Sequence, residues 1–419
     1  MKKIMKILWI CNSILPQIAQ KLQVAPPLGG GWMSALAQDV VANGNSELTV
    51  CFPHSLFVQG EAAGMKYFGF AAEEDLRRIL AQEDADIIHI FGTEYMHSYY
   101  AAKAARDFGL SKKTVVNIQG IISFAAKHYF CGIPGYAKYA RTFRDIIKRE
   151  SINKAQKSFE KRGVFERRVL NMVHHVIGRT DWDYACTRQI NPELKYHLCN
   201  ETLRDSFYEN EWDINTCEKH SVFVSQCNYS LKGFHNVIEA MQTVIKRYPD
   251  AKLYTTGRSL LNKNDFMSKL KLTYYEAYLK KLIKKYNLEN NVVFTGPLDE
   301  KKMCERYVKS HVFVLSSSVE NSPNSLGEAM ILGVPTVTAD VGGVKALFNH
   351  NEDGFIYQAD APYMLAENIC KIFASDELAK IFSENAKKHA RVIHNRENNL
   401  KTMLKIYGEI TGGKTHETV

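Results

Sequence analysis

The segment of residues 318–335 constrains this chain most, because it joins the end of a buried strand to the start of a helix through a polar loop. It follows the apolar run at residues 312–315, which is typical of a central strand in a parallel sheet. Such sheets bind ligands at the carboxyl ends of their strands, where the first amides of the next helix and its positive dipole face the ligand. Glu320 and Glu328 stand eight residues apart around this helix start. The segment predicts a phosphate site flanked by two acceptors for sugar hydroxyl groups.

A purely structural explanation of the same residues stays open at this point. Ser325 and Glu328 have the spacing of a capping box, in which the glutamate side chain returns to the amide of the N-cap residue. Such pairs open many helices, so the spacing alone does not separate a ligand site from a cap.

Short apolar runs alternate with helical patterns in both halves of the chain, which predicts two doubly wound α/β domains of Rossmann type. The predicted strands are at residues 7–11, 48–52, 87–90, 114–118 and 173–177, and at residues 221–225, 252–256, 291–295, 311–315 and 336–339. A length of 419 residues also exceeds what one hydrophobic core usually supports. We predict domains at residues 1–200 and 201–395 that face a cleft, and a terminal helix and tail at 396–419 that returns to the first domain.

The composition is that of an ordinary globular protein, with 45% hydrophobic and 24% charged residues. The nine cysteines form no Cys-x-x-Cys pair, which indicates reduced thiols and a cytoplasmic protein. The apolar run after the first lysines is interrupted at Asn12, so a buried strand is favoured over a signal peptide. No stretch approaches the roughly 20 apolar residues of a membrane-spanning helix.

The net charge of +9 is concentrated in residues 127–168, where twelve Lys or Arg residues stand against four acidic residues, a net +8. Aromatic and aliphatic residues are interleaved with these charges, which suits peripheral contact with an anionic membrane at the inner face of the cell membrane. A solvated helix face explains such a charge run equally well. Nucleic acid is not expected as a partner, because no recognised nucleic-acid module accompanies the segment.

A set of motifs in the second half resembles the retaining GT-B glycosyltransferases of group 1, whose signature is Glu-x7-Glu. The family includes enzymes that build bacterial capsule, lipopolysaccharide and exopolysaccharide. The motifs that carry the resemblance occur in the family's order at residues 222–234, 292–298, 318–335, 338–343 and 351–355. The first 200 residues match the family only loosely.

The resemblance implies roles for the residues around the predicted helix start. Glu328 would accept hydrogen bonds from the ribose hydroxyl groups of the donor. Glu320 and the backbone of Asn324, Ser325 and Leu326 would hold the donor sugar and its diphosphate.

The Lys-Gly motif at Lys232 would neutralise the departing diphosphate, whose charge grows as the glycosidic bond breaks. The family usually has an arginine shortly before this lysine, but Gln226 stands there, and Arg258 is a candidate to compensate. The backbone near Leu298 is where the resemblance places the nucleotide base. A plain surface lysine is the structural alternative for Lys232.

The glycine run at residues 29–31 opens a predicted helix after the first strand, and glycines let backbone amides approach a diphosphate closely. In the resemblance, Gly30 and Gly31 correspond to the first loop near the donor diphosphate. The run lacks the Gly-x-Gly-x-x-Gly spacing and a Walker lysine, so a flexible turn is the alternative.

His97, Gln119 and His128 are the candidate contacts to the acceptor. Gln119 occupies the position of a family histidine, and a glutamine can hydrogen-bond a sugar hydroxyl group but cannot relay a proton.

The resemblance therefore implies a retaining, metal-independent hexosyltransferase in cell-surface polysaccharide synthesis, with Lys232 and Glu320 as its catalytic residues. Its donor would be a nucleoside diphosphate sugar, which acts as co-substrate without a further cofactor, and its acceptor a saccharide or a polyprenyl-linked saccharide. Two alternatives stay open: a GT-B nucleotide-sugar epimerase, and a non-catalytic protein that binds nucleotide sugars.

Overall fold

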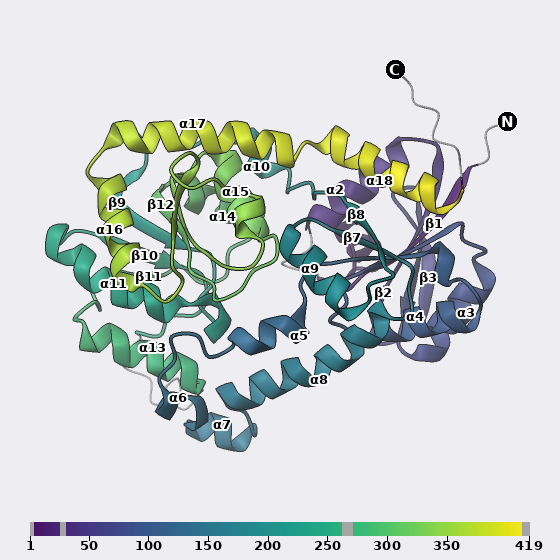
Figure 1. Ribbon diagram of the computed structural model, residues 1–419, viewed down its shortest axis with the longest axis horizontal. Coiled ribbons are helices and arrows are strands. Elements are labelled where there is room, and N and C mark those ends of the chain that lie inside the picture. Colours follow the sequence, from purple (N-terminus) through teal and green to yellow (C-terminus); the bar gives the residue numbers. More distant parts are fainter. Residues whose placement is uncertain (1–3, 26–30, 262–270, 413–419) are drawn as a thin grey trace. The chain divides into compact units, whose positions relative to one another are not determined.

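The computed structural model describes residues 4–25, 31–261 and 271–412 (Figure 1). The chain forms two compact units. The first consists of Met1–Phe124, Lys161–Arg204 and Ile393–Val419, and the second of Ala125–Glu160 and Asp205–Val392.

The first unit is built on an eight-stranded sheet in the order β3-β4-β2-β1-β5-β6-β7-β8. All neighbouring strands are parallel except β3 and β4, which form an antiparallel hairpin at one edge. The strands are β1 (Met5–Ile10), β2 (Ser46–Pro53), β3 (Val58–Ala62), β4 (Met65–Phe70), β5 (Ile87–Phe91), β6 (Thr114–Asn117), β7 (His175–Gly178) and β8 (Lys195–Leu198). The edge hairpin and β8 were not predicted, because short edge strands lack the continuous apolar run of buried parallel strands.

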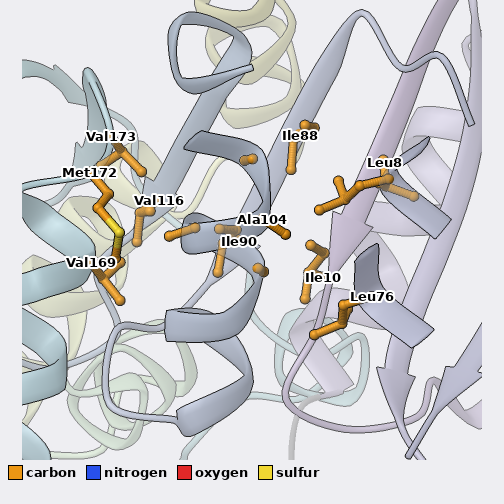
Figure 2. Close-up of a cluster of buried hydrophobic side chains, with 14 of the residues drawn as sticks. Leu8, Ile10, Leu76, Ile88, Ile90, Ala104, Val116, Val169, Met172 and Val173 are labelled. Atoms are coloured by element: carbon orange, nitrogen blue, oxygen red, sulfur yellow. The ribbon is translucent and has the colours of Figure 1, made fainter. Parts of the chain in front are cut away.

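Helices cover both faces of this sheet. They are α1 (Pro16–Lys21), α2 (Gly31–Ala42), α3 (Glu73–Gln82), α4 (Met96–Asp107), η1 (Ser111–Lys113), α5 (Ile122–Ala125), α8 (Ile152–Leu170), α9 (Asp181–Ile190) and α18 (Arg396–Ile410). The boundary between the units falls within α5 and α8, and again before the last residue of α17 (Asp376–Ile393). Successive side chains of a strand point to opposite faces, so β1 contributes Leu8 and Ile10 to one core layer (Figure 2). Its Ile7 and Trp9 belong to the opposite layer.

The terminal helix α18 packs in the first unit, as predicted. Its Tyr407 is fully buried, and the hydroxyl group accepts a hydrogen bond from Trp9 Nε1 at 3.0 Å. His89 Nδ1 lies 2.5 Å from the same hydroxyl oxygen, and burial lowers the pKa of His89 to about 3. His89 is therefore a packed structural residue.

The second unit is built on a six-stranded parallel sheet in the order β11-β10-β9-β12-β13-β14. The strands are β9 (Glu218–Val224), β10 (Lys252–Thr255), β11 (Val292–Phe294), β12 (Ser310–Leu315), β13 (Thr336–Ala339) and β14 (Gly354–Tyr357). The helices are η2 (Ala126–His128), α6 (Gly135–Tyr139), α7 (Phe143–Ile147), α10 (Ser206–Glu209), η3 (Ser230–Lys232), α11 (Phe234–Arg247), α13 (Tyr274–Lys285), α14 (Glu300–Val308), α15 (Asn324–Leu332), η4 (Val344–Ala346), α16 (Pro362–Phe373) and α17 (Asp376–Ile393). Both sheets are doubly wound, as predicted from the alternation of apolar runs and helical patterns.

The predicted first domain, residues 1–200, differs from the structure because Ala125–Glu160 belongs to the second unit. Long-range hydrogen bonds tie this segment there. Ser230 Oγ donates to the Tyr129 carbonyl at 2.9 Å, and Thr142 Oγ1 donates to the carbonyl of residue 272 at 2.7 Å. Sequence patterns do not report contacts between residues a hundred positions apart.

Within the described part of the chain, no helix combines the length and the apolar content that a membrane span requires.

Candidate functional site

The candidate site lies at the carboxyl ends of β9 and β12, which are neighbours in the middle of the second sheet. β10 lies on the other side of β9, so the chain winds outward in both directions from this pair. Ligands of doubly wound sheets bind at such a reversal of strand order. The loop after β9 carries Lys232, and the loop after β12 carries Glu320.

These two predicted catalytic residues form an ion pair. Lys232 Nζ lies 2.6 Å from Glu320 Oε1, and Ser317 Oγ donates to the same carboxylate oxygen at 2.6 Å. The side chains are largely buried, with 22% of Lys232 and 14% of Glu320 exposed. Lys232 is therefore not the plain surface lysine of the structural alternative.

The charge of Lys232 is stabilised by its neighbours. Burial by itself lowers the pKa of the ammonium group, but the Glu320 carboxylate and the Tyr229 hydroxyl outweigh this effect and raise the pKa above its ordinary value. Burial also raises the pKa of Tyr229, whose ring centroid lies 5.8 Å from Lys232 Nζ. The site thus contains a fixed cation next to a neutral phenol.

The backbone of the Lys-Gly motif requires its glycine. Gly233 has φ +65°, and a Cβ atom there would stand 1.9 Å from the Ser316 carbonyl oxygen. The same loops are joined by the hydrogen bond from Ser316 Oγ to the Lys232 carbonyl at 2.7 Å and by that from Ser318 N to the Leu231 carbonyl at 2.7 Å. This close approach of two loops positions Lys232 beside the end of β12.

A second glycine fixes Glu320. Gly342 has φ +51°, and a Cβ atom there would stand 1.8 Å from the Glu320 carbonyl oxygen. The amide of Gly343 donates to that carbonyl at 3.1 Å. The loop after β13 therefore holds the backbone of Glu320 from one side of β12, and the loop after β9, which carries Lys232, lies on the other side.

Helix α15 begins directly after the loop that follows β12 and carries Glu320. Its N-cap is Pro323, and no side-chain cap bond forms, so Ser325 and Glu328 do not make the capping box that remained open from the sequence. The amides of Asn324 and Ser325, in the first turn, have no partner within the helix and offer hydrogen-bond donors to an anion. The predicted backbone contact at Leu326 is wrong, because this residue is fully buried and its amide donates to the Pro323 carbonyl at 2.9 Å. The Glu328 side chain is 7% exposed.

The residues predicted for the far side of the donor site follow β9, β10 and β11. Gln226 is exposed at the end of β9, and Leu298 is partly buried after β11. Arg258, the proposed substitute cation, donates Nε and NH2 hydrogen bonds to the Glu276 carboxylate at 2.8 and 2.5 Å. Its charge is already matched by this bidentate pair on α13.

In the first unit, two predicted residues lie at another reversal of strand order, between β1 and β5. Gly31 opens α2 after β1, and Gly30 lies outside the described residues. His97 is the second residue of α4, after β5, and its ring stacks on Tyr95 with centroids 5.1 Å apart. Burial lowers the pKa of His97 to about 4, so the imidazole is neutral at neutral pH.

The other predicted acceptor contacts occupy separate positions. Gln119 follows β6 and donates Nε2 to Glu201 Oε1 at 2.7 Å. Glu201 is itself paired with the buried Arg179 at 2.5 Å, which fixes the glutamine inside the first unit. His128 is exposed at the end of η2 and belongs to the second unit.

Sequence reasoning missed two carboxyl groups near the end of β5. Glu166 is fully buried and accepts hydrogen bonds from the amides of Ile122 and Ser123, each at 2.9 Å. Burial and then the charge of Glu166 raise the pKa of Glu94 to about 7. The signal for Glu94 was its position just after a strand, next to the Gly92 turn.

Among the described residues, His, Cys, Asp and Glu side chains do not gather in groups of three or more that could hold a metal ion.

Comparison with known proteins finds a sequence similarity in the second unit. Residues 205–389 match the family model of the glycosyl transferases of group 1. The chain is 25% identical over 177 residues to the D-inositol 3-phosphate glycosyltransferase of Corynebacterium urealyticum, covering 42% of this chain and 40% of that protein. It is also 25% identical over 178 residues to the N-acetyl-alpha-D-glucosaminyl L-malate synthase of Bacillus anthracis, covering 42% of each protein. The chain thus aligns over less than half the length of these curated relatives.

Solved structures extend the similarity to the whole fold. The sucrose-phosphate synthase of Thermosynechococcus elongatus has a TM-score of 0.71 at 15% identity, covering 97% of this chain and 99% of that one. Anabaena HepE in complex with UDP-glucose has a TM-score of 0.66 at 15% identity, covering 97% of this chain and all of HepE. At this identity the likeness shows the fold alone, which is the two-domain GT-B architecture of parallel α/β sheets.

Proposed function

We propose that this chain, whose residues 205–389 match the family model of the group 1 glycosyl transferases, transfers a sugar from a nucleoside diphosphate sugar to an acceptor. The observation that carries the proposal is the buried Lys232–Glu320 pair at the reversal of strand order, next to the first amides of α15. An ammonium group and a helix N-terminus together suit a diphosphate.

In the proposed reaction, Lys232 and the amides of Asn324 and Ser325 bind the diphosphate, and their effect is largest as its charge grows on departure. Glu328 accepts hydrogen bonds from the ribose, and Glu320 holds the donor sugar. Because the cation and the amides balance the developing charge, the proposed transfer needs no divalent ion.

We further propose that transfer retains the anomeric configuration, with the acceptor attacking on the face that the diphosphate leaves. The support is the Glu-x7-Glu spacing of Glu320 and Glu328, which this chain shares with the retaining family it resembles. The proposed acceptor is a saccharide or a polyprenyl-linked saccharide of cell-surface polysaccharide synthesis, at the inner face of the cell membrane. Since HepE was solved with UDP-glucose, UDP sugars are the first donors to test.

One observation favours a second candidate function, a protein that binds nucleotide sugars without turning them over. Gln226 occupies the position where the family usually has an arginine, and Arg258 is engaged by Glu276. Of the residues that the structure describes near the ends of β9 and β12, Lys232 would then be the only cation at the diphosphate.

The test is a panel of nucleotide sugars scored by thermal stabilisation, because a ligand that binds only the native state raises the melting temperature. Donor hydrolysis or transfer is then measured with the best ligand. We expect Glu328→Ala to weaken nucleotide binding, and Lys232→Ala to lower turnover more than donor affinity, with the exposed Lys388→Ala as control. Stabilisation without any turnover would support the binding protein, and no stabilisation by any donor would contradict both functions.

A further inference from the structure

Helices α6 and α7 of the second unit expose five large apolar side chains. Tyr136 and Tyr139 on α6, three residues apart, lie along one side of that helix. Phe143, Ile146 and Ile147 on α7 share a face, since they are spaced three and four residues apart. All five are between 59 and 68% exposed. We call these five residues the apolar patch.

Contacts on the opposite sides of α6 and α7 fix the outward orientation of the patch. The opposite sides of the two helices carry Ala137 and Asp145, which are buried. Asp145 Oδ2 accepts a hydrogen bond from the Tyr274 amide at 2.8 Å, and Thr142, the N-cap of α7, donates Oγ1 to the Leu272 carbonyl at 2.7 Å. A buried carboxylate on the inner side and isoleucines on the outer side reverse the usual polarity of a surface helix.

Basic side chains surround the apolar patch. Lys138 is partly exposed, and Arg141, Lys148, Arg149, Lys281, Lys284 and Lys285 are exposed on the same segment and on α13, which contacts α6 (Figure 1). Lys281 Nζ lies 5.9 Å from the ring centroid of Tyr136. The nearby acids offset little of this charge, because Asp145 and Glu150 both pair with Arg144, at 3.4 and 2.5 Å.

We infer that the apolar patch and its basic surround dock this protein on an anionic lipid membrane. Aromatic and aliphatic side chains enter the boundary between headgroups and acyl chains, while lysine and arginine bind the anionic headgroups. A symmetric contact with a second copy would bring the same basic residues against each other, which is unfavourable. The structure also narrows the predicted membrane-facing segment, residues 127–168, to residues 136–149.

This inference goes beyond the donor chemistry, since docking needs no nucleotide sugar. One consequence rests on the proposed function: a docked enzyme would meet an acceptor that is anchored in the same membrane, which favours a lipid-linked saccharide over a free one.

The test is sedimentation with vesicles of phosphatidylcholine, with and without phosphatidylglycerol, in the absence of nucleotide sugar. We expect binding only to the anionic vesicles, and we expect it to fade at high salt. Ile146→Ser with Ile147→Ser should weaken binding by about tenfold or more, because apolar contacts with the membrane are lost. Arg141→Gln with Lys148→Gln should weaken it by about tenfold at low salt.

Helix α17 provides matched controls in the same unit. Ile381 and Val392 are exposed there, as are Lys380 and Lys388. Ile381→Ser with Val392→Ser, and Lys380→Gln with Lys388→Gln, should leave vesicle binding unchanged. All the substituted side chains are exposed, so unchanged melting temperatures are expected and show that each variant is folded.

Three outcomes would overturn the inference. The wild type could fail to sediment with anionic vesicles at low salt. Alternatively, the variants of the apolar patch and of its basic surround could bind vesicles as well as the α17 variants do. Sedimentation velocity without lipid could instead show a dimer that Ile146→Ser with Ile147→Ser dissociates, which would make the patch a contact between copies. Stabilisation by nucleotide sugars is measured separately, so a failure of docking leaves the proposed transferase standing.

Discussion

Replacing Glu320 by glutamine should tighten the binding of a nucleoside diphosphate. In the structure the Lys232 ammonium is held by the Glu320 carboxylate at 2.6 Å, at the position where the proposed diphosphate must bind. A diphosphate must therefore compete with a carboxylate for the same cation. Glu320→Gln keeps the shape of the side chain, removes the competing charge and leaves the ammonium available.

The size of the effect follows from the geometry. Opposite unit charges 2.6 Å apart attract by roughly 6 kcal/mol at an effective dielectric constant of 20. Most of this attraction is offset by the desolvation of the two groups, which leaves about 1 to 3 kcal/mol for a charge-assisted hydrogen bond. Since 1.4 kcal/mol corresponds to a factor of ten, we expect affinity for the diphosphate to rise about tenfold.

The assay is calorimetric titration with the nucleoside diphosphate of the donor that stabilises the protein most. Lys232→Met should weaken binding of this product about tenfold and that of the intact donor less, because the product carries more charge. Ser317→Ala is the control, since it removes the other hydrogen bond to Glu320, at 2.6 Å, without changing any charge. The reasoning is refuted if Glu320→Gln leaves the affinity unchanged or lowers it.

Three further predictions concern stability. Gly342→Ala should lower the free energy of unfolding in denaturant by about 3 kcal/mol, because the new Cβ meets a carbonyl oxygen at positive φ. Gly44→Ala, at positive φ in open space, should lower it by about 1 kcal/mol. Equal costs would contradict the close contact at Gly342. Glu94 binds a proton more tightly in the folded state, where its pKa is about 7, than in the unfolded state, where it is about 4.5. The free energy of unfolding should therefore fall by up to about 3 kcal/mol as the pH rises from about 4.5 through 7. Glu94→Gln should flatten that slope in unfolding measured across pH, and an unchanged slope would refute the assignment. Tyr407→Phe should destabilise the first unit by about 2 kcal/mol in denaturant unfolding, because the Trp9 N–H loses its acceptor; an unchanged midpoint would contradict this.

Local pattern was sufficient to predict that both sheets are doubly wound, but it missed β3, β4, β8 and β14, which lie at or next to the sheet edges. A buried parallel strand requires an unbroken apolar run, and the helix after it requires a periodic one, so the alternation of the two predicts a doubly wound sheet. The same reasoning placed the loop of Glu320 at a strand end, where ligands bind. What local pattern could not separate was a ligand site from a capping box at Ser325 and Glu328, because both need the same spacing.

The sequence by itself determined the alternation of central strands and helices, and which strand ends carry Lys232 and Glu320, because these depend on neighbours within a few residues. Only the tertiary structure decided that these two side chains pair across 88 positions, that Arg258 is bound by Glu276, and that residues 125–160 join the second unit. It also decided which side of α7 faces outward. Each of these depends on the order in which strands assemble and on contacts between distant segments, which a local pattern does not encode.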